Sequence, residues 1–497
     1  MWKRFLIAGA LIVALSGAAA ATIALNTVSG IAAEVFPTTV HVPKSVVAPV
    51  YSGGPQTFLI LGSDRRPQAK DAFDRNDPPH SDTILLVRFD PQQGQTSMLS
   101  IPRDLQVDIS APDGQIFAGE KINAAYTIGA RLGGTREAMV LAAETIEHQV
   151  FPTLKLNGIV DVDFAGFINV VDTLGCVYVN VDHRYFHLNG PGEEQYSEIN
   201  LQPGYQKLCY QSALSYVRYR HQDSDFVRVA RQQDFLRDLR GQISAEDVLA
   251  QIDAVAKAVG HAIVSTFHDS ASQLIELAKL VAFSQAKPLR QVKFRALNAN
   301  AQLNGGSYVT STPELEEQTL SEFLASSPRA AVPSAPASSG ARSRAGARGQ
   351  GGVDASSAAA LGLDPVAPGS RPGGVPFPLL FPTLQAAPAT EQTVRAYDLR
   401  DREGRLRHAY VAVWRQNSDG GYYDFEGSDW LDPPFLARPD QARKIGGRTY
   451  LLFDDGGHVH TIAWHEAGAL YWLTNTLLED LSNAQMLAIA RSAAPLP

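Results

Sequence analysis

A low-complexity tract in the second half of the chain sets the strongest limit on how this protein can fold. From Ser326 to about Pro372 the sequence consists largely of Ala, Ser, Pro, Gly and Arg. Such a tract buries too little apolar surface to offset the entropy of an ordered chain, so we expect a flexible linker. The folded parts of the protein must then lie on either side of it.

Length and composition agree with more than one folded part. The chain has 497 residues, too many for one ordinary core, and its 45% hydrophobic and 19% charged residues are typical of globular proteins. A net charge of −8 gives no reason to expect a nucleic-acid partner. We expect a cytoplasmic tip and transmembrane signal-anchor over residues 1–33, a stalk over 34–55, a first domain over 56–325, a disordered linker over 326–374 and a small β-rich domain over 375–497.

The N-terminus predicts export across a membrane. Lys3 and Arg4 precede an uncharged stretch whose most apolar part, Phe5 to Leu25, is just long enough to span a bilayer as a helix. The positive charges favour a single pass through the cell membrane, with the N-terminus inside, the domains outside the cytoplasm and the lipid bilayer as a partner. The alternative is a cleaved signal peptide, because Gly17 to Ala21 offers small residues suited to a signal peptidase. The length of the apolar run favours the anchor.

The first domain reads as an α/β fold, because short apolar runs typical of buried strands alternate with longer runs at helical spacing. The expected strands are Thr57 to Gly62, Thr83 to Phe89, Thr96 to Ile101 and Cys176 to Val181. The expected helices are Gly133 to Val150, Phe164 to Leu174, Ser212 to Tyr219, Val227 to Leu239 and, with interruptions, Ala245 to Leu280. Segments near Val292 to Leu297 and Glu314 to Leu324 complete this expectation.

The C-terminal part predicts a small β-rich domain closed by a helix. Runs of Tyr, Trp and Val are broken by Gly420-Gly421 and Asp455-Gly456-Gly457, which are hairpin signals. Ser482 is placed to cap a short amphipathic helix. The aromatic side chains of this part would suit stacking on sugars, but a place in the core is the commoner role.

A cluster of histidines in the same part is a candidate metal site. His458, His460 and His465 lie close together in the sequence, with Glu466 adjacent, and the first two would share one face of a strand. No second pair of ligands supports a metal there, so we expect none.

The two cysteines, Cys176 and Cys209, fall in the same expected domain. In an exported protein such a pair favours a disulfide over a catalytic thiol. The bond would close a loop of about thirty residues and stabilise the fold by roughly 3 kcal/mol. Two free buried thiols are the alternative.

The segment from Arg218 to Arg240 carries the densest positive charge. On a helix, Asp225, Arg228 and Gln232 share one face, and Arg231 lies three residues from Arg228. Arginine matches phosphate oxygens bidentately, so several converging guanidinium groups suit a pyrophosphate. A solvated helix face that pairs with acids such as Asp223 and Asp234 explains the same pattern equally well.

Charged residues also stand at the ends of three expected strands. Asp64 follows the first strand, Asp82 precedes the second, and Arg103 with Asp104 follows the third. Ligands of open α/β sheets gather at such ends, and acids near arginines can hold a magnesium ion that bridges phosphate oxygens. A capping role in a turn is the commoner one for each single Asp.

Taken together, five motifs resemble the LytR-CpsA-Psr family, in the family's order and over roughly Gln56 to Ala325. They are Gly62-Ser63-Asp64-Arg65-Arg66, Ser81-Asp82-Thr83, Ser100-Ile101-Pro102-Arg103-Asp104, Lys121-Ile122-Asn123-Ala124-Ala125-Tyr126, and Tyr216-Val217-Arg218-Tyr219-Arg220 with Asp225, Arg228 and Arg231-Gln232-Gln233. The resemblance implies a three-layer α/β/α domain with an apolar pocket for a polyprenyl chain. It also implies an enzyme that moves a glycopolymer from polyprenyl pyrophosphate to peptidoglycan through a phosphodiester link.

The resemblance further implies roles for single residues. Asp64 and Asp82 match the acids that bind Mg²⁺, for which Mn²⁺ is a substitute. The residues that match the pyrophosphate-binding set are Arg103, Arg218, Arg220, Arg228, Arg231 and Gln232. Asp82, Arg103 and Asp225 are the expected catalytic residues. Many family members have Arg just ahead of Ser81, where this chain has His80, with Arg75 upstream.

The expected mechanism follows from charge. Arginines and Mg²⁺ would neutralise the pyrophosphate as polyprenyl phosphate leaves, and Asp82 or Asp225 would accept the proton of the attacking sugar hydroxyl. Two alternatives stay open. Water in place of the sugar hydroxyl would make the protein a hydrolase of polyprenyl pyrophosphates, and a protein without catalysis would be a regulator that binds lipid-linked precursors.

Overall fold

The structure is a computed structural model, and it describes residues 39–65, 78–189, 198–219, 223–242, 263–267, 276–277, 279–280, 283–284, 289–303, 305–325, 355–366, 374–416 and 421–495. These residues group into two compact units. The first unit contains the described residues up to Leu174, those of 244–287 and those of 293–323. The second contains those of 175–243, 288–292 and from Leu324 onward, so it joins the Arg-rich segment to the C-terminal part. The domain boundaries expected from the sequence concern independent folding and stay a prediction.

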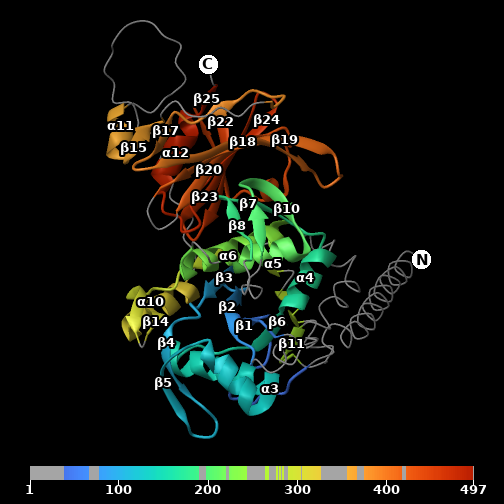
Figure 1. Cartoon of the computed structure of the whole chain (residues 1–497), viewed down its shortest axis with the longest axis vertical. Coiled ribbons are helices and arrows are strands. Elements are labelled where there is room, and N and C mark those ends of the chain that lie inside the picture. Colours follow the sequence, from blue (N-terminus) through green and yellow to red (C-terminus); the bar gives the residue numbers. More distant parts are fainter. Residues whose placement is uncertain are drawn as a thin grey trace, which may run out of the picture. The chain divides into compact units, whose positions relative to one another are not determined.

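The first unit combines strands and helices (Figure 1). Its strands are β1 (Gln56–Ser63), β2 (Ser81–Asp90), β3 (Gln95–Ser100), β4 (Gln106–Ser110), β5 (Ile116–Lys121), β6 (Gly158–Asp163), β11 (Ile263–Ser265), β13 (Asn298–Leu303) and β14 (Gly306–Thr310). Its helices are α3 (Ala124–Thr145), the short π-helix η1 (Ile146–Val150), α4 (Phe164–Thr173) and α10 (Pro313–Leu324).

A mixed sheet forms the centre of this unit. The strands that this unit contributes to the sheet lie in the order β11-β6-β1-β2-β3, with β1 antiparallel to β2 and parallel to β6. The run Phe58 to Leu61 is apolar on both faces because β1 is a central strand, and Phe58 packs against Phe89 and Phe267. The sheet therefore brings the end of β1 and the start of β2 together, and the first site residues follow there.

The second unit contains a hairpin and two helices followed by the C-terminal strands. The elements before residue 300 are β7 (Val177–Val181), β8 (Tyr185–His187), β9 (Ile199–Leu201), β10 (Gly204–Leu208), α5 (Tyr210–Arg218), α6 (Asp225–Gln242) and β12 (Leu289–Val292). The later ones are α11 (Ala355–Ala360), β15 (Leu363–Pro365), β16 (Leu380–Phe381), β17 (Leu384–Ala386), β18 (Thr390–Arg400), β19 (Leu406–Arg415), β20 (Tyr422–Ser428), η2 (Pro434–Ala437), β21 (Gln441–Ile445), β22 (Arg448–Asp455), β23 (His458–Glu466), β24 (Ala469–Thr474), α12 (Asn483–Ser492) and β25 (Ala494–Pro495).

An antiparallel sheet dominates the C-terminal part, with strands in the order β18-β19-β20-β24-β23-β22-β21. Alternate residues of each strand face opposite sides of the sheet. Apolar side chains occupy both sets of positions, so the sheet has two apolar faces. One face packs against α12 and includes Tyr410 and Tyr471, whereas the other contacts the β7–β10 hairpin through Tyr178 and Tyr205. The β7–β10 hairpin, which precedes the Arg-rich segment in the chain, is thus part of the core of the C-terminal sheet.

Several expectations about the C-terminal part are confirmed. The turn at Gly456 and Gly457 joins β22 to β23, and the hydroxyl of Ser482 caps α12 by accepting from the backbone N–H of Gln485. The tryptophans Trp430, Trp464 and Trp472 are buried, so they serve the core and are not available for stacking on sugars. The fold class is confirmed as well: the protein has an α/β part with a mixed sheet and a β-rich C-terminal region.

Part of the tract expected to be a linker has regular structure. Residues 355–366 form α11 and β15, and β15 pairs with β17 through Leu363 and Ala386. Ala358 and Leu363 are buried in the core of the C-terminal sheet, which supplies the apolar contacts that the tract lacks by itself. The linker expectation therefore does not hold for these residues.

The expected localisation is contradicted. In the part of the chain that the structure describes, no helix is both long enough and apolar enough to cross a bilayer. The segment Phe5 to Leu25, for which a single-pass anchor is predicted, lies outside the described residues.

Most of the helix expected over Ala245 to Leu280 also lies outside the described residues, and the part described at Ile263–Ser265 is a strand.

Candidate functional site

A β-bulge redirects the chain where β1 ends and β2 begins. The register between the two strands shifts after Gly62, so that Ser63 lies opposite Ser81. A Cβ atom at Gly62 would lie 2.9 Å from the Cβ of Thr83, so only glycine allows this close approach. Asp64 follows Ser63 and Asp82 follows Ser81, so both carboxylates come from the same end of the strand pair.

Asp64 is anchored to the backbone that precedes β2. Its Oδ1 accepts the backbone N–H of His80 at 2.6 Å, and its own N–H donates to the carbonyl of His80 at 3.1 Å. The ring Nδ1 of His80 lies 3.8 Å from Oδ2 of Asp64. His80 therefore lies directly beside the first acid.

Asp82 forms an ion pair with Arg103, which follows β3. Both side chains are partly exposed, so the pair is open to a ligand. The Nε of Arg103 also lies 3.6 Å from Oδ2 of Asp104, which is nearly buried. Two of the expected catalytic residues are thus brought together.

The Lys121 to Asn123 segment holds the loop that carries Arg103. The backbone N–H of Asn123 donates to the carbonyl of Arg103 at 3.2 Å, and that of Ile122 donates to Leu105 at 2.8 Å. Nζ of Lys121 lies 2.7 Å from Oδ1 of Asp104. The segment acts on the site through the position of this loop.

Two acids of β6, Asp161 and Asp163, lie beside the end of β1. They are not among the site residues predicted from the sequence. Arg65 lies 3.5 Å from Asp161 and 3.4 Å from Asp163, and the hydroxyl of Tyr126 donates to Asp161 at 3.0 Å. Burial raises the pKa of Asp161, while the charge of Arg65 and hydrogen bonds from Ser63 and Tyr126 oppose that rise. The alternation Asp161-Val162-Asp163 in an apolar strand was the available signal.

In the second unit, a disulfide leads into the arginine segment. Cys176 and Cys209 are bonded, as expected, and they flank the β7–β10 hairpin, in which Val177 pairs with Leu208. Helix α5 begins at the next residue, Tyr210, and ends at Arg218. The disulfide therefore fixes the start of the helix that carries Arg218, whose side chain is partly exposed.

Arg231 is enclosed by protein groups. Its side chain is 0% exposed and forms an ion pair with Asp223. Its Nη1 donates to the carbonyls of Tyr219 at 2.7 Å and Tyr216 at 3.3 Å, and its Nε donates to the hydroxyl of Tyr185 at 3.2 Å. In this arrangement Arg231 ties α6 to the end of α5.

Asp225 and Arg228 form a second pair on α6. The carboxylate lies 2.5 Å from Nη2 of Arg228, and both side chains are nearly buried. Asp225 stands in the first turn of α6, where a negative charge is stabilised by the helix dipole. Gln232 donates to the carbonyl of Val217 at 3.0 Å. Arg66, Arg75 and Arg220 lie outside the described residues.

The chemistry of Asp64 and Asp82 fits a magnesium ion. Mg²⁺ is commonly held by one or two carboxylates, with water and substrate phosphates as the other ligands. Among the described residues, no group of three or more His, Cys, Asp and Glu side chains could hold a metal ion. Asp64 and Asp82 provide two partly exposed carboxylates at one end of a strand pair, which is the number of protein carboxylates that Mg²⁺ commonly uses.

Comparison with known proteins gives similar chains. A Bacillus subtilis protein named polyisoprenyl-teichoic acid–peptidoglycan teichoic acid transferase TagV is 31% identical over 205 residues, which are 41% of this chain and 47% of that protein. A Halalkalibacterium halodurans protein named polyisoprenyl-teichoic acid–peptidoglycan teichoic acid transferase TagU is 28% identical over 222 residues, which are 44% of this chain and 64% of that protein. The chain thus spans less than two thirds of either relative.

A crystal structure of TagV from Bacillus subtilis is similar over 55% of this chain and 97% of that one, with a TM-score of 0.41 and 24% identity. The model of the LytR_cpsA_psr family matches residues 29–323. Because this match covers more than half of the sequence and includes the site residues described above, the chain belongs to the LytR_cpsA_psr family.

Proposed function

We propose that this protein transfers a glycopolymer from a polyprenyl pyrophosphate carrier onto peptidoglycan and forms a phosphodiester link. The observation that carries the proposal is the Asp82–Arg103 ion pair at the strand end that also carries Asp64. An arginine held beside a carboxylate combines a group that neutralises phosphate charge with a group that accepts a proton. The names of these two relatives, which describe teichoic acid transfer to peptidoglycan, support the same reaction.

The reaction requires one bond to form and one to break at phosphorus. A hydroxyl oxygen of the acceptor sugar attacks the phosphorus that bears the glycopolymer, and the bond to the bridging oxygen of polyprenyl phosphate breaks. The hydroxyl proton passes to a carboxylate, Asp82 or Asp225, and the leaving phosphate keeps the electron pair. Arg103, with Arg218 and Arg228 of the arginine segment, would bind the phosphate oxygens and neutralise their charge.

Asp64 and Asp82 would hold Mg²⁺, with Mn²⁺ as a substitute. A bound cation would supply further positive charge at the phosphate oxygens. Asp82 then has two roles open to it, as a metal ligand and as a base. Asp225 is not one of the two acids that would hold Mg²⁺, so the role open to it is that of a base.

The test is a transfer assay with the purified chain, a short-chain polyprenyl-pyrophosphate glycan, Mg²⁺ and an acceptor glycan strand. We expect muramic acid linked to the polymer, detected by mass spectrometry. Asp82→Asn and Arg103→Gln should each lower the rate at least a hundredfold, whereas Asp113→Asn, in an exposed turn of the same unit, should not change it. Free polymer phosphate without linked muramic acid would indicate a hydrolase, and binding without turnover would indicate a regulator; either result contradicts the transfer reaction.

A further inference from the structure

A network of charged side chains joins the second half of α6 to the C-terminal strands. Arg237 forms an ion pair with Asp455, the last residue of β22, and its Nη1 lies 2.9 Å from Oδ1 of Asp234 on its own helix. The side chain of Asp455 is 2% exposed and that of Arg237 is 22% exposed. The guanidinium group of Arg237 therefore connects α6 to β22 in a largely enclosed position.

His460 makes a second link from the sheet to α6. Its Nε2 lies 3.2 Å from Oδ2 of Asp234, and its Nδ1 lies 2.8 Å from the hydroxyl of Thr461. The register between β22 and β23 shifts after Phe453, and His460 is the extra residue of this β-bulge. The bulge takes His460 out of the regular alternation of the strand, and its ring contacts α6.

Strand β12 completes the network. Oδ1 of Asp455 accepts the backbone N–H of Gln291 at 2.6 Å, and Nε2 of Gln291 donates to Oδ1 of Asp234 at 3.0 Å. Asp234 thus has partners on α6, β12 and β23. Burial acts to raise the pKa of Asp234, but the charges of Arg237 and His460 outweigh it and lower the pKa to about 2. Asp234 is therefore ionised at neutral pH and attracts both groups.

The first half of the same helix carries Arg228 and Gln232, which are expected to bind the pyrophosphate. Helix α6 runs without a break from Asp225 to Gln242, and Arg237 comes nine residues after Arg228. Nine residues correspond to about 14 Å along a helix axis. Because the helix moves as one rod, a shift or tilt of its second half would also displace Arg228 and Gln232.

The network favours one position of α6 on the C-terminal strands. The cost of taking charges out of water offsets much of their attraction, so a buried ion pair adds little net stability, whereas a displaced partner leaves a buried charge uncompensated. Displacement of α6 would leave the carboxylate of Asp455 without the guanidinium group of Arg237. The network therefore acts on the placement of the helix more than on the stability of the fold.

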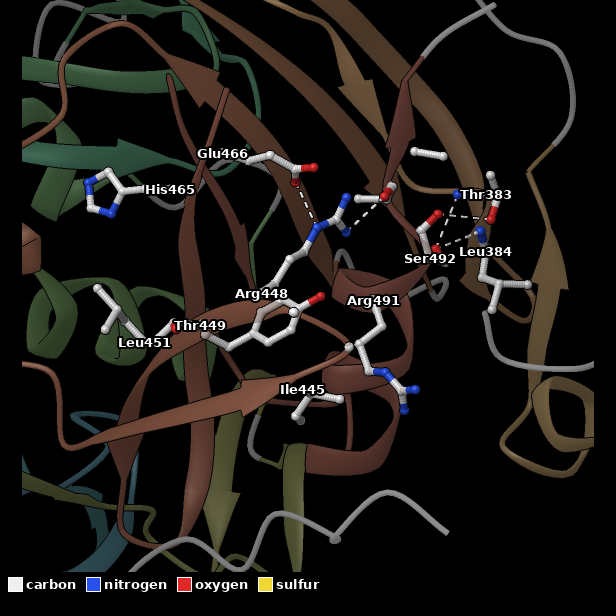
Figure 2. A pocket seen from close by; sticks show the side chains of 15 residues that line it. Thr383, Leu384, Ile445, Arg448, Thr449, Leu451, His465, Glu466, Arg491 and Ser492 are labelled. Carbon is white, nitrogen blue, oxygen red and sulfur yellow. Dashed lines mark hydrogen bonds and ion pairs between the residues drawn. The ribbon is translucent and has the colours of Figure 1, made fainter. Parts of the chain in front are cut away.

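A second ion pair supports the same two strands at their other ends. Nε of Arg448, the first residue of β22, lies 2.7 Å from Glu466, the last residue of β23, beside a pocket of about 780 Å³ (Figure 2). Nη1 of Arg448 also donates to the carbonyl of Ala493 at 2.9 Å. At about 3.3 Å per residue, Arg448 lies roughly 23 Å along β22 from Asp455. Arg448 is therefore a matched control for the contacts with α6.

We propose that Arg237, Asp455 and His460 are positioning residues, through which the C-terminal strands hold α6 in its pyrophosphate-binding place. They act through Arg228 and Gln232, which would contact the carrier. The C-terminal part thereby takes part in the proposed transfer reaction, on which this inference rests, without contacting the substrate itself.

Two measurements on the full chain test the positioning role. Steady-state kinetics give KM for the polyprenyl-pyrophosphate glycan and for the acceptor strand, and calorimetric titration with geranyl pyrophosphate measures carrier binding without turnover. Arg237→Met should raise the donor KM and the Kd of geranyl pyrophosphate at least about tenfold, with kcat and the acceptor KM changed less than about threefold. A partly unfolded protein would instead show a lower apparent kcat with an unchanged KM, since only its folded fraction reacts.

Three further variants separate the links from general destabilisation. His460→Ala removes one partner of Asp234 and should raise the same two constants about threefold. Arg237→Lys keeps a positive charge between the two acids and should fall between the wild type and Arg237→Met. The control Arg448→Met breaks an ion pair of the same strands and should leave both constants within about twofold of the wild type. Thermal unfolding checks that every variant is folded at the assay temperature.

The inference is overturned if a folded Arg237→Met protein binds geranyl pyrophosphate and the donor like the wild type, or if Arg448→Met weakens binding as strongly. It is also overturned if the wild type does not bind geranyl pyrophosphate at millimolar concentration. Failure of the transfer reaction gives a different result. A wild type that binds geranyl pyrophosphate, with weaker binding in Arg237→Met but no polymer-linked muramic acid, would contradict the proposed function and leave the positioning role in place.

Discussion

Lys121 holds Asp104 in place through an ion pair of 2.7 Å, in which Lys121 is 30% exposed and Asp104 only 6%. Asp104 is the direct neighbour of Arg103, and the backbone of Asn123 binds the carbonyl of Arg103. The chain before α3 therefore supports the loop that presents Arg103 to Asp82. These contacts give a physical reason for the motif that begins at Lys121, although none of its side chains is expected to react with the substrate.

Replacing Lys121 tests this positioning role. Lys121→Met leaves the nearly buried carboxylate of Asp104 with less compensation and should lower the free energy of unfolding by about 1–2 kcal/mol. Arg103 should be drawn from Asp82 towards Asp104, so kcat/KM of the transfer assay should fall about tenfold, equivalent to about 1.4 kcal/mol in the barrier.

Urea denaturation and steady-state kinetics check both effects, with Lys155→Met, at an exposed position, as the control. A loss of stability with unchanged kcat/KM would mean that the ion pair supports the fold but does not position Arg103.

Arg231 should act on stability more than on substrate binding. Arg231→Met removes the partner of buried Asp223 and the donors to two backbone carbonyls, so we expect a loss of about 3–5 kcal/mol in urea denaturation. Arg218→Met changes a partly exposed side chain and should cost only about 1 kcal/mol, while it should abolish most of the transfer activity. A stable Arg231→Met protein that no longer binds the pyrophosphate carrier would instead restore the binding role expected from the sequence.

The contrast between these two arginines shows what the sequence cannot determine. Helical spacing places Arg228 and Arg231 near each other, and this is correct. The groups that enclose Arg231 come from Tyr185, Tyr216 and Tyr219, whose approach depends on how α5, α6 and β8 pack. A local pattern contains no information on that packing, so a buried and an accessible arginine look alike in it.

Local signals were sufficient elsewhere. The strands β1, β2 and β3, the helices α4, α5 and α6 and the Ser482 cap follow from apolar periodicity and capping residues, which act within a few residues. The packing of Tyr178 and Tyr205 on the C-terminal sheet was not foreseeable, because it joins residues more than 190 positions apart. The same holds for β15, whose strand partner β17 decides its structure.

Glu426 should make stability depend on pH. Burial raises the pKa of its carboxyl from the ordinary 4.5 to about 7, against hydrogen bonds from the Tyr397 hydroxyl and the backbone N–H of Tyr205. Below about pH 4.5 the group is protonated in both the folded and the unfolded chain. Between about pH 4.5 and 7 the unfolded chain loses this proton first, so the free energy of unfolding falls as pH rises, by up to about 3 kcal/mol for this group.

The matched experiment compares the wild type with Glu426→Gln across that pH range. The amide still accepts the hydrogen bond from Tyr397 but does not ionise, so the stability difference should shift in favour of the variant from pH 4.5 to pH 7 and then stay constant. Thermal or urea unfolding at each pH measures it. Glu403→Gln, at an exposed turn, is the control, and parallel curves for wild type and Glu426→Gln would contradict the assignment.

The disulfide should stabilise the second unit and the start of α5 together. Cys176 and Cys209 are 33 residues apart, so loss of the bond should lower the free energy of unfolding by roughly 3–4 kcal/mol through the entropy of the unfolded chain. Because these are the two cysteines of the chain, the double variant Cys176→Ser/Cys209→Ser and the wild type under reducing conditions should unfold at the same urea concentration.

Transfer activity should fall in both proteins, since Tyr210, the first residue of the helix that ends at Arg218, follows Cys209 directly. A reduced wild type that is as stable as the oxidised form would show that hairpin pairing alone fixes this segment, whereas a stability loss with full activity would show that Arg218 is positioned by α6 and Arg231 instead.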